Sequence, residues 1–362
     1  MDARRTPIGT RGRGLAAVTA PHLAAPVLAA LAAGLEEPPG EVVLGNCMGP
    51  GGDVARVATL AAGLPESVPA LTVDRQCASG LAAIEIGAAL AAGGRTVLAG
   101  GVESASTAPW RLWPPSGGEE ARRYERAPFA PTPEQDPDMG LAADLLAEEH
   151  GIDRARQDAY AAASHQRAWD ALAAGLFDEE LVPVAGLERD ERLRDGMTAE
   201  RLSRFPAAFR EAGTVTAGNS CGVNDGAAAV TIAPPGDRPG LRVLATASAG
   251  VDPRRPGIGL VPAVRRALAE AGLTVADLDV IEVNEAFAGQ VLACYDDLGI
   301  DPARACAQGG ALALGHPWGA SGAVLVVRLF AQMIRQGRGR YGLAAVAAGG
   351  GQGTAVVVEA CR

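Results

Sequence analysis

An internal repeat constrains the fold of this chain more than any other feature of its sequence. The tetrapeptide Cys77-Ala78-Ser79-Gly80 opens one helical pattern, and Gly319-Ala320-Ser321-Gly322 opens another in the last third of the chain. Each pattern is followed by an apolar run that ends in glycine, at 97–101 and at 345–350. Recurrence of one order of elements indicates duplication. We therefore expect two similar α/β halves.

Short apolar runs alternate with helical patterns in both halves. The first half is predicted to contain strands at Glu41–Leu44, Leu71–Asp74 and Thr96–Ala99 and a helix at Gly80–Ala92. The second half is predicted to contain strands at Val280–Val283 and Leu343–Ala347 and a helix at Ala320–Gln336. This alternation predicts mostly parallel sheets with helices packed on them.

A region of different composition separates the two halves, from about Pro109 to Pro234. It is rich in proline and charged residues and contains helical patterns at Ala142–His150 and Arg154–Gly175. We interpret it as an inserted loop domain that carries binding loops, with a return strand near Gly226–Ile232 that rejoins the first half. The predicted boundaries are 1–108 with 226–238 for the N-terminal half, 109–225 for the loop domain and 239–362 for the C-terminal half.

The composition fits a globular protein and argues against several classes of function. Of the 362 residues, 48% are hydrophobic, which is enough to bury a large core. The net charge of −10 argues against a nucleic-acid surface, because such surfaces are basic. All 32 basic residues are arginine, which excludes lysine Schiff bases and lysine general bases.

The sequence carries no signal for a membrane, a secretory route or a metal. Gly, Pro and charged residues interrupt the apolar runs before they reach the roughly 18 residues of a membrane span. The N-terminal segment Met1–Pro7 has no apolar signal core, so we expect a cytoplasmic protein. The spacing of the six cysteines indicates neither a zinc site nor a disulfide framework.

Cys77 is the strongest candidate for a nucleophile. It stands where a predicted strand ends and a predicted helix begins, so its sulfur is expected to face free backbone N–H groups and the positive end of the helix dipole. That placement lowers the pKa of a thiol and favours the thiolate, which attacks carbonyl carbons. Many free cysteines are inert packing residues, so the assignment depends on the neighbouring motifs.

His316 and Asn284 can supply the groups that a nucleophilic cysteine needs. His316 stands three residues before Gly319, which matches Cys77 in the repeat, so a pseudo-twofold arrangement would bring its imidazole towards the thiol. A Cys–His pair supplies a nucleophile and its base. Asn284 follows a predicted strand, where its amide can anchor a water or stabilise a thioester oxygen, although asparagine at a strand end is also a common turn former.

The other three histidines are predicted to be structural. His165 lies on the polar face of a helical pattern, and His22 and His150 stand in charged, exposed settings. The glycines at 349–351 can point backbone N–H groups into the same site as Cys77, but a glycine run alone is a weak signal because tight turns use it often.

The motifs of the chain resemble those of thiolases of the acetyl-CoA acetyltransferase family over nearly its whole length. They are Arg5–Gly9, Val73–Gly80, Met139–Leu141, Ser164–Gln166, Gly213–Ser220, Asn224–Ala228, Asn284–Ala288 and Gly309–Pro317. So many matches in one order are highly specific. The resemblance implies a five-layered α/β/α/β/α thiolase fold of two duplicated halves plus an inserted loop domain, and assembly as a homodimer or homotetramer.

The resemblance also implies roles for individual residues. In enzymes of this kind a cysteine takes the acyl group from acyl-CoA, a histidine activates it, and a water held by asparagine forms an oxyanion hole with the histidine. The matching residues are Cys77, His316 and Asn284, and backbone N–H groups of Cys77 and Gly349 would form a second oxyanion hole. Coenzyme A enters as a thioester substrate and no permanent cofactor is implied; the matching contact positions are Met139, Arg194, Phe209, Ala217, Ser220, Ala286 and Phe287.

Three positions depart from the pattern of the family. The second cysteine of the family, the acid/base that removes a proton from the acetyl α-carbon, falls at Ala347, and a methyl group cannot carry that proton. Cys221 replaces a serine that is common in the pantetheine contact. The first strand of the family is almost wholly missing before Asp2, which we interpret as a wrongly assigned start because its loss would expose a sheet edge.

Three functions therefore stay open. The first is carbon–carbon bond formation or thiolysis as an acyl-CoA C-acyltransferase, with another group, for example Cys306, replacing the missing cysteine. The second is decarboxylative condensation or acyl transfer to an amine or alcohol, for which Cys–His–Asn suffices. The third is a non-catalytic acyl-CoA-binding subunit, a function that retention of Cys77, His316 and Asn284 argues against.

Overall fold

The N-terminal half folds around a six-stranded mixed sheet, and the computed structural model describes residues 2–236 and 238–362 of the chain. The strands are β1 (Ala3–Arg5), β2 (Gly9–Thr10), β3 (Glu41–Gly45), β4 (Ala70–Val73), β5 (Val97–Ser104) and β8 (Asn224–Ile232). Their order is β1-β8-β5-β3-β4, with β2 also paired to β8. Strand β3 is parallel to β4 and β5, whereas β8 is antiparallel to β5 and β1.

The C-terminal half has a four-stranded sheet with a similar mixture of directions. Its strands are β9 (Gly240–Gly250), β10 (Val280–Val283), β11 (Tyr341–Ala348) and β12 (Gln352–Cys361), in the order β10-β11-β12-β9. Only β10 and β11 are parallel. The prediction of mostly parallel sheets was therefore wrong. The glycine turn at 349–351 joins β11 directly to β12, and a turn this short can join only antiparallel strands.

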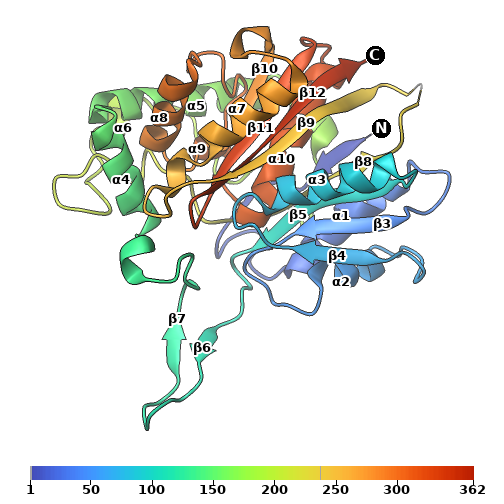
Figure 1. Ribbon diagram of the computed structural model, residues 1–362, viewed down its shortest axis with the longest axis horizontal. Helices are drawn as coiled ribbons and strands as arrows, with labels where there is room; N and C mark the ends of the chain where they lie inside the picture. The colour runs from blue at the N-terminus through green and yellow to red at the C-terminus, as the bar shows by residue number, and fades with distance from the viewer. Residues whose placement is uncertain (1, 237) are drawn as a thin grey trace.

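Helices cover both sheets and fill the space between them, which gives five layers (Figure 1). The helices of these layers are α1 (Ala20–Ala32), α2 (Val54–Ala61), α3 (Ser79–Ala92), α7 (Leu260–Ala271), α8 (Ala288–Leu298) and α10 (Trp318–Phe330). Helices α1 and α2 lie on the outer face of the first sheet, and α7 and α8 lie on the outer face of the second. Helices α3 and α10 lie between the sheets, within a separate buried core. The predicted five-layered α/β/α/β/α fold is confirmed.

The two central helices touch near their N-termini because glycines line the contact. A Cβ atom at Gly80 would lie 2.7 Å from the main-chain nitrogen of Ala323, and a Cβ at Gly322 would lie 2.6 Å from that of Leu81. Real Cβ atoms do not approach other atoms so closely, so only glycine allows this helix spacing. The contact brings the segment before α3, which holds Cys77, next to the segment before α10.

The region between the halves forms a helical subdomain and an extended hairpin. Its elements are β6 (Arg111–Trp113), β7 (Arg122–Tyr124), α4 (Met139–Glu149), α5 (Arg154–Ala173) and α6 (Ala199–Leu202). Helices α4 and α5 pack against α8 and the short α9 (Ala311–Leu314) of the C-terminal half. The hairpin of β6 and β7 extends away from the body of the molecule (Figure 1). It carries exposed hydrophobic side chains, among them Trp110, which is 76% exposed.

Most of the predicted elements are present close to their predicted bounds. Every predicted strand overlaps an observed one, and the predicted return strand lies within β8, which pairs with β5. The predicted helix at Ala320–Gln336 is shorter, since α10 ends at Phe330 and the chain continues as a π-helical turn at Ala331–Arg335. The predicted division into two halves and a loop domain, with its boundaries, stays a prediction.

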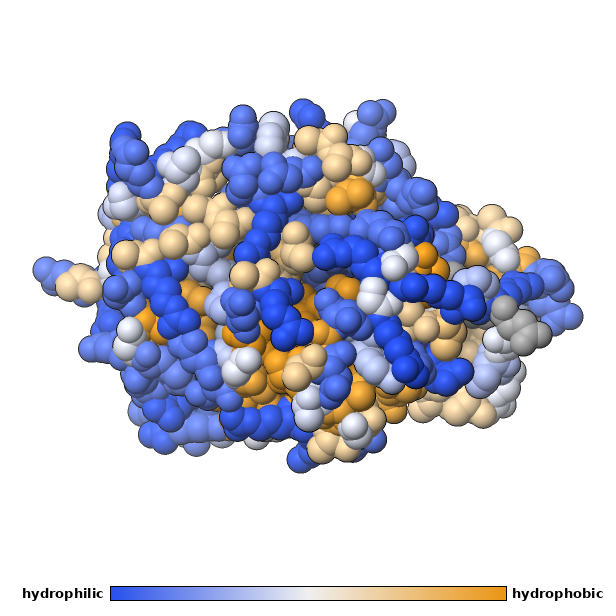
Figure 2. Space-filling model, turned by 90° about the horizontal axis from the view of Figure 1, so that it is seen from above, coloured by the Kyte–Doolittle hydropathy of each residue, from blue (hydrophilic) through white to orange (hydrophobic). Residues whose placement is uncertain are grey.

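The surface is mainly polar, with apolar areas between the charged side chains. Figure 2 shows one such apolar area near the middle of the face seen from above. Among the helices of residues 2–236 and 238–362, none has the length and apolar character to cross a membrane.

Candidate active site

Cys77 lies in a tight turn between β4 and α3. Gln76 takes a positive φ of 50°, and the hydroxyl of Ser79 donates to the Gln76 carbonyl at 2.6 Å, which bends the chain sharply before the helix. The Cys77 side chain is half-buried. Main-chain N–H groups of Cys77 and Gly349 both interact with its sulfur. Backbone donors from the two halves therefore meet at this thiol.

The pKa of the Cys77 thiol contradicts the expectation from its helix position. Burial, aided by the nearby Cys221 and Glu103, raises the pKa of Cys77 to about 12, although the two N–H groups lower it. The prediction that the helix start favours the thiolate was therefore wrong, because burial disfavours the charged thiolate more than the nearby N–H groups favour it. The thiol needs a base to release its proton.

His316 lies between α9 and α10 and is held on three sides. Its Nδ1 atom is 2.6 Å from the Ser321 hydroxyl, and its main-chain N–H donates to the Asn224 side chain at 3.0 Å. Its Nε2 atom is 3.5 Å from Nδ2 of Asn284. Burial lowers the pKa of His316 to about 4, so the imidazole is neutral at pH 7 and can accept a proton.

Asn284 follows β10 and is almost fully buried. Its main-chain N–H donates to the Ala345 carbonyl of β11 at 3.0 Å. The next residue, Glu285, is fixed by three donors: the Tyr160 hydroxyl at 2.7 Å, the Ser164 hydroxyl at 2.7 Å and the Leu312 N–H at 3.1 Å. The loop that carries Asn284 is thus tied to α5 and to the segment that leads to His316.

Contacts across the halves bring the three predicted residues into one region. Strands β10 and β11 are parallel, so Asn284 and Gly349 follow the same ends of neighbouring strands. The buried carboxylate of Glu103, at the end of β5, accepts from Gly319 N–H and Cys47 N–H, each at 3.1 Å. Glu103 thereby holds the start of α10 beside the loops around Cys77.

Most of the predicted coenzyme A contacts also lie together. The rings of Phe209 and Phe287 meet edge to face with centroids 5.9 Å apart. Phe209 packs directly over Gly140, next to Met139. Ser220 forms a β-bridge with Phe287, and the N–H of Cys221 donates to the Ala286 carbonyl at 2.9 Å. Ala217 is exposed in the same segment as Ser220, and Arg194 is exposed close to His165.

Two sequence-based assignments are wrong in the structure. His165 is buried, not on a polar face, because α5 packs with that side against the C-terminal half; burial lowers its pKa to about 4. Cys306 is fully buried, and its thiol donates to the Val283 carbonyl at 3.2 Å. Its neighbours are Glu285 and Glu282, so Cys306 faces the interior and cannot replace a base at the Cys77 site. His22 is exposed and His150 is partly exposed, as predicted.

Sequence reasoning missed the residues that support this region. Ser321 belongs to the repeated Ala-Ser-Gly motif, so the repeat contained a signal for its position beside His316. Nothing in the sequence around Glu103 or Arg192 indicated that they would lie near the site. No group of three or more His, Cys, Asp or Glu residues within the described ranges, 2–236 and 238–362, is arranged to hold a metal ion.

The sequence and the fold of the chain match known proteins over nearly its whole length. The family descriptions "Thiolase, N-terminal domain" and "Thiolase, C-terminal domain" match residues 1–235 and 238–360. A putative acetyl-CoA C-acetyltransferase YhfS of Bacillus subtilis is 41% identical, over 99% of this chain and 98% of that protein. An acetyl-CoA acetyltransferase of Pseudomonas aeruginosa is 42% identical over the same shares.

Solved structures agree with these relatives. The crystal structure of the Bacillus anthracis acetyl-CoA acetyltransferase has a TM-score of 0.92 and 37% identity, covering 99% of this chain and 97% of that chain. Human mitochondrial 3-ketoacyl-CoA thiolase in complex with CoA also has a TM-score of 0.92, with 36% identity over 100% of this chain and 97% of that chain. The chain belongs to the thiolase family.

Proposed function

We propose that this chain, an acyl-CoA C-acyltransferase of the thiolase family, forms an acyl-enzyme on Cys77 with His316 as its base. The observation that carries the proposal is the meeting of the two helix starts, which places the Cys77 segment beside the segment of a neutral, buried imidazole. A thiol whose pKa is raised to about 12 forms little thiolate at pH 7, so a base that takes its proton during attack is needed.

Two sets of donors suit the negative oxygen that forms during acyl transfer. The main-chain N–H groups of Cys77 and Gly349 both point at the sulfur, close to where a carbonyl carbon would bond to it. Asn284 lies beside Nε2 of His316 and can hold a water for the second hole. Fixed donors of this kind contribute about 10²–10³-fold each in rate.

The proposed substrate is a coenzyme A thioester, with no permanently bound cofactor. The human relative whose structure contains CoA shares the fold over the whole chain, which supports this assignment. We assign the CoA contacts to a surface around the Phe209 and Phe287 rings, which includes Met139, Arg194, Ala217, Ser220 and Ala286. Arg194 is the exposed cation of this set and suits a phosphate group.

Two enzymatic versions of this function differ in whether they need an acid/base group in place of Ala347. It lies in β11, two residues before Gly349, with its methyl group partly exposed. By resemblance it stands where thiolases carry the acid/base cysteine. Claisen condensation and thiolysis then need a substitute group, whereas decarboxylative condensation or acyl transfer does not. The non-catalytic binding subunit is the third and least supported function, because Cys77, His316 and Asn284 are retained in one region.

The proposal extends to assembly and location. We propose a homodimer or homotetramer, in line with the resemblance, and a cytoplasmic protein. The exposed hairpin of β6 and β7 supports assembly, because Trp110 and Leu112 are 76% and 54% exposed. Large apolar side chains in this position usually meet a partner.

Intact-protein mass spectrometry after mixing with acetyl-CoA tests the acyl-enzyme. We expect the protein to gain the mass of one acetyl group, because Cys77 holds the acyl chain as a thioester. The Cys77→Ala variant should gain none. Absence of the gain in the wild-type protein would contradict both enzymatic versions of the function and leave the binding subunit.

A further inference from the structure

A thiolase that forms carbon–carbon bonds needs a group that takes a proton from the α-carbon of its second substrate. Ala347 offers none, so another side chain near Cys77 must do so if the chain has this activity. This inference rests on the proposed acyl-enzyme at Cys77. Cysteine is the residue type that thiolases use there, which makes the other thiols of the chain the first candidates.

The charges around each thiol distinguish the candidates. Cys306 is fully buried against Glu285 and Glu282, and Cys294 donates to the Gly257 carbonyl beneath α8. Cys47 lies near Cys77, but its neighbour is the carboxylate of Glu103, and its thiol donates to the Gln76 carbonyl at 3.1 Å. A nearby negative charge disfavours a thiolate. Cys306 and Cys294 are also fully buried, out of reach of a substrate, so none of these three thiols suits the role.

Cys221 differs because its neighbours join the two other catalytic loops. Its N–H donates to the Ala286 carbonyl at 2.9 Å, two residues after Asn284. Two residues further on, Val223 forms a β-bridge with His316, and Asn224 accepts from the His316 N–H. The segment of Cys221 thus runs between the Asn284 loop and the His316 loop. The half-buried thiol of Cys221 also has the largest effect on the pKa of Cys77 after burial itself.

A fixed cation lies beside Cys221. The guanidinium of Arg192 donates to the Ser220 carbonyl at 2.9 Å and to the Leu312 carbonyl at 3.1 Å. A Cβ at Gly222 would lie 2.8 Å from Nη1 of Arg192, so the cation packs directly against the Cys221 segment. Burial and the carboxylate of Glu285 raise the pKa of Cys221, whereas the charge of Arg192 lowers it, so that the pKa of Cys221 is raised overall to about 12. The two hydrogen bonds of Arg192 do not neutralise its guanidinium, because carbonyl oxygens carry no full charge. Its positive charge therefore still acts on the Cys221 thiol.

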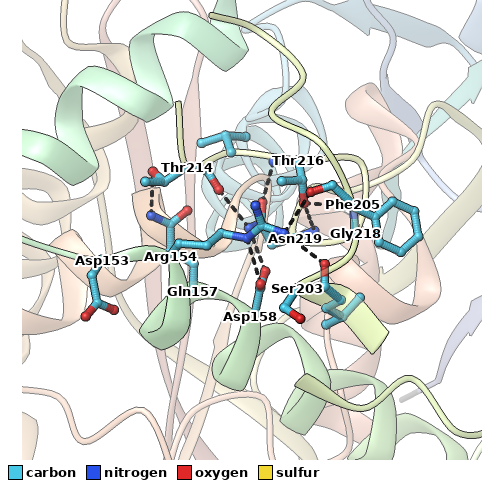
Figure 3. Close-up of polar contacts among 12 residues, drawn as sticks. Asp153, Arg154, Gln157, Asp158, Ser203, Phe205, Thr214, Thr216, Gly218 and Asn219 are labelled. Carbon is cyan, nitrogen blue, oxygen red and sulfur yellow. Dashed lines mark hydrogen bonds and ion pairs between the residues drawn. The ribbon is translucent and has the colours of Figure 1, made fainter. Parts of the chain in front are cut away.

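The chain before Cys221 is held rigidly on α5. Asn219 donates to Asp158 at 3.0 Å, and Asp158 accepts from Arg154 at 2.6 Å (Figure 3). Gln157 donates to the Thr214 hydroxyl at 2.9 Å in the same network (Figure 3). These bonds fix the residue two positions before Cys221, which suits a group that must meet a substrate in a defined position.

We propose that Cys221 is the acid/base of carbon–carbon bond formation, in place of the thiol that is missing at Ala347. In the first half-reaction Cys77 Sγ bonds to the acyl carbon, the Cys77 proton passes to His316, and the leaving CoA sulfur takes the proton of Cys221. The Cys221 thiolate then takes a proton from the α-carbon of a second acyl-CoA. The electron pair of that C–H bond forms the new bond to the acyl carbon, the bond to Cys77 breaks, and Cys77 recovers its proton from His316.

Deuterium exchange into acetyl-CoA in D₂O, measured by mass spectrometry beside acylation of Cys77, tests the proposal. We expect the wild-type protein to exchange the methyl protons, because Cys221 removes them reversibly. Cys221→Ala and Cys221→Ser should both slow the exchange about 10²–10⁴-fold. Both variants should still become acylated on Cys77, since CoA can also leave with the proton of His316. Cys47→Ser is the matched control and should exchange like the wild-type protein.

Measuring acylation of Cys77 separates the test of the Cys221 role from the test of the acyl-enzyme. If the wild-type protein is acylated but shows no exchange, or if Cys221→Ala exchanges at the wild-type rate, the role of Cys221 is contradicted and the acyl-enzyme stands. Full exchange in Cys221→Ser would also contradict it, because it would show that the position matters for contacts and not for proton transfer. A wild-type protein without acylation would overturn the acyl-enzyme and this inference together.

Discussion

The two halves of the molecule place a helix start at the same point of the fold and give it different chemistry. In the N-terminal half the turn before α3 carries Cys77, the proposed nucleophile, whose sulfur interacts with its own N–H group. In the C-terminal half the turn before α10 carries His316, oriented by Ser321 of the matching Ala-Ser-Gly sequence. The duplicated backbone thus supplies two equivalent positions, and in the proposed function their side chains assign one to attack and the other to proton transfer.

The strand ends of the two halves differ in the same way. Strand β5 carries a buried carboxylate, Glu103, one residue before its end, and this carboxylate accepts from Gly319 at the start of α10. Ala347 is the last residue but one of strand β11, which leads to Gly349, whose N–H reaches Cys77. Each half therefore supports the reactive residue of the other. Neither half alone contains all the residues of the proposed site.

Removal of the proposed base, His316, should have the largest effect. His316→Ala is expected to slow acylation of Cys77 by about 10²–10⁴-fold, because the thiol then has no positioned group to take its proton. Rapid-mixing mass spectrometry with acetyl-CoA measures the rate. His22→Ala, which removes an exposed histidine from α1, is the control and should keep the wild-type rate. An unchanged rate in His316→Ala would show that the two helix starts do not cooperate.

A substitution at the contact between α3 and α10 should have a smaller effect, on stability. Gly80→Ala places a Cβ 2.7 Å from the main chain of α10, so we expect a loss of about 1–3 kcal/mol in the free energy of unfolding. Denaturant titration measures this loss. Gly34→Ala is the matched control, since a Cβ there meets its nearest atom at an ordinary 3.5 Å. Equal stability of the two variants would mean that α3 and α10 are not in close contact.

Local sequence patterns predicted the helices and strands well. The features that these patterns did not predict depend on packing between segments that are far apart in the chain. The bounds of β10 were predicted from the apolar run Val280–Val283 alone. The raised pKa of Cys77 and the burial of His165 depend on segments far away in the chain, which no local pattern reveals. Cys306 was chosen for its closeness in sequence to His316, but its thiol turns towards β10.

The site residues also show how much local sequence patterns can predict. Cys77, His316 and Asn284 stood out because each lies in a motif that the repeat or the family explains. Cys221 was noted only as a replacement for serine, since its closeness to Arg192 and to the His316 loop arises from the fold. The nearby charge and the contacts on which the proposed role of Cys221 rests could not be predicted from its sequence neighbours.

Isotope exchange between acetyl-CoA and labelled free CoA tests the central claim most directly, because it needs an acyl-enzyme and no α-proton removal. We expect the wild-type protein to move the label into acetyl-CoA and the Cys77→Ala variant not to do so. Exchange that survives in Cys77→Ala, or that is absent from the wild-type protein, would contradict the assignment of Cys77 as the residue that holds the acyl group.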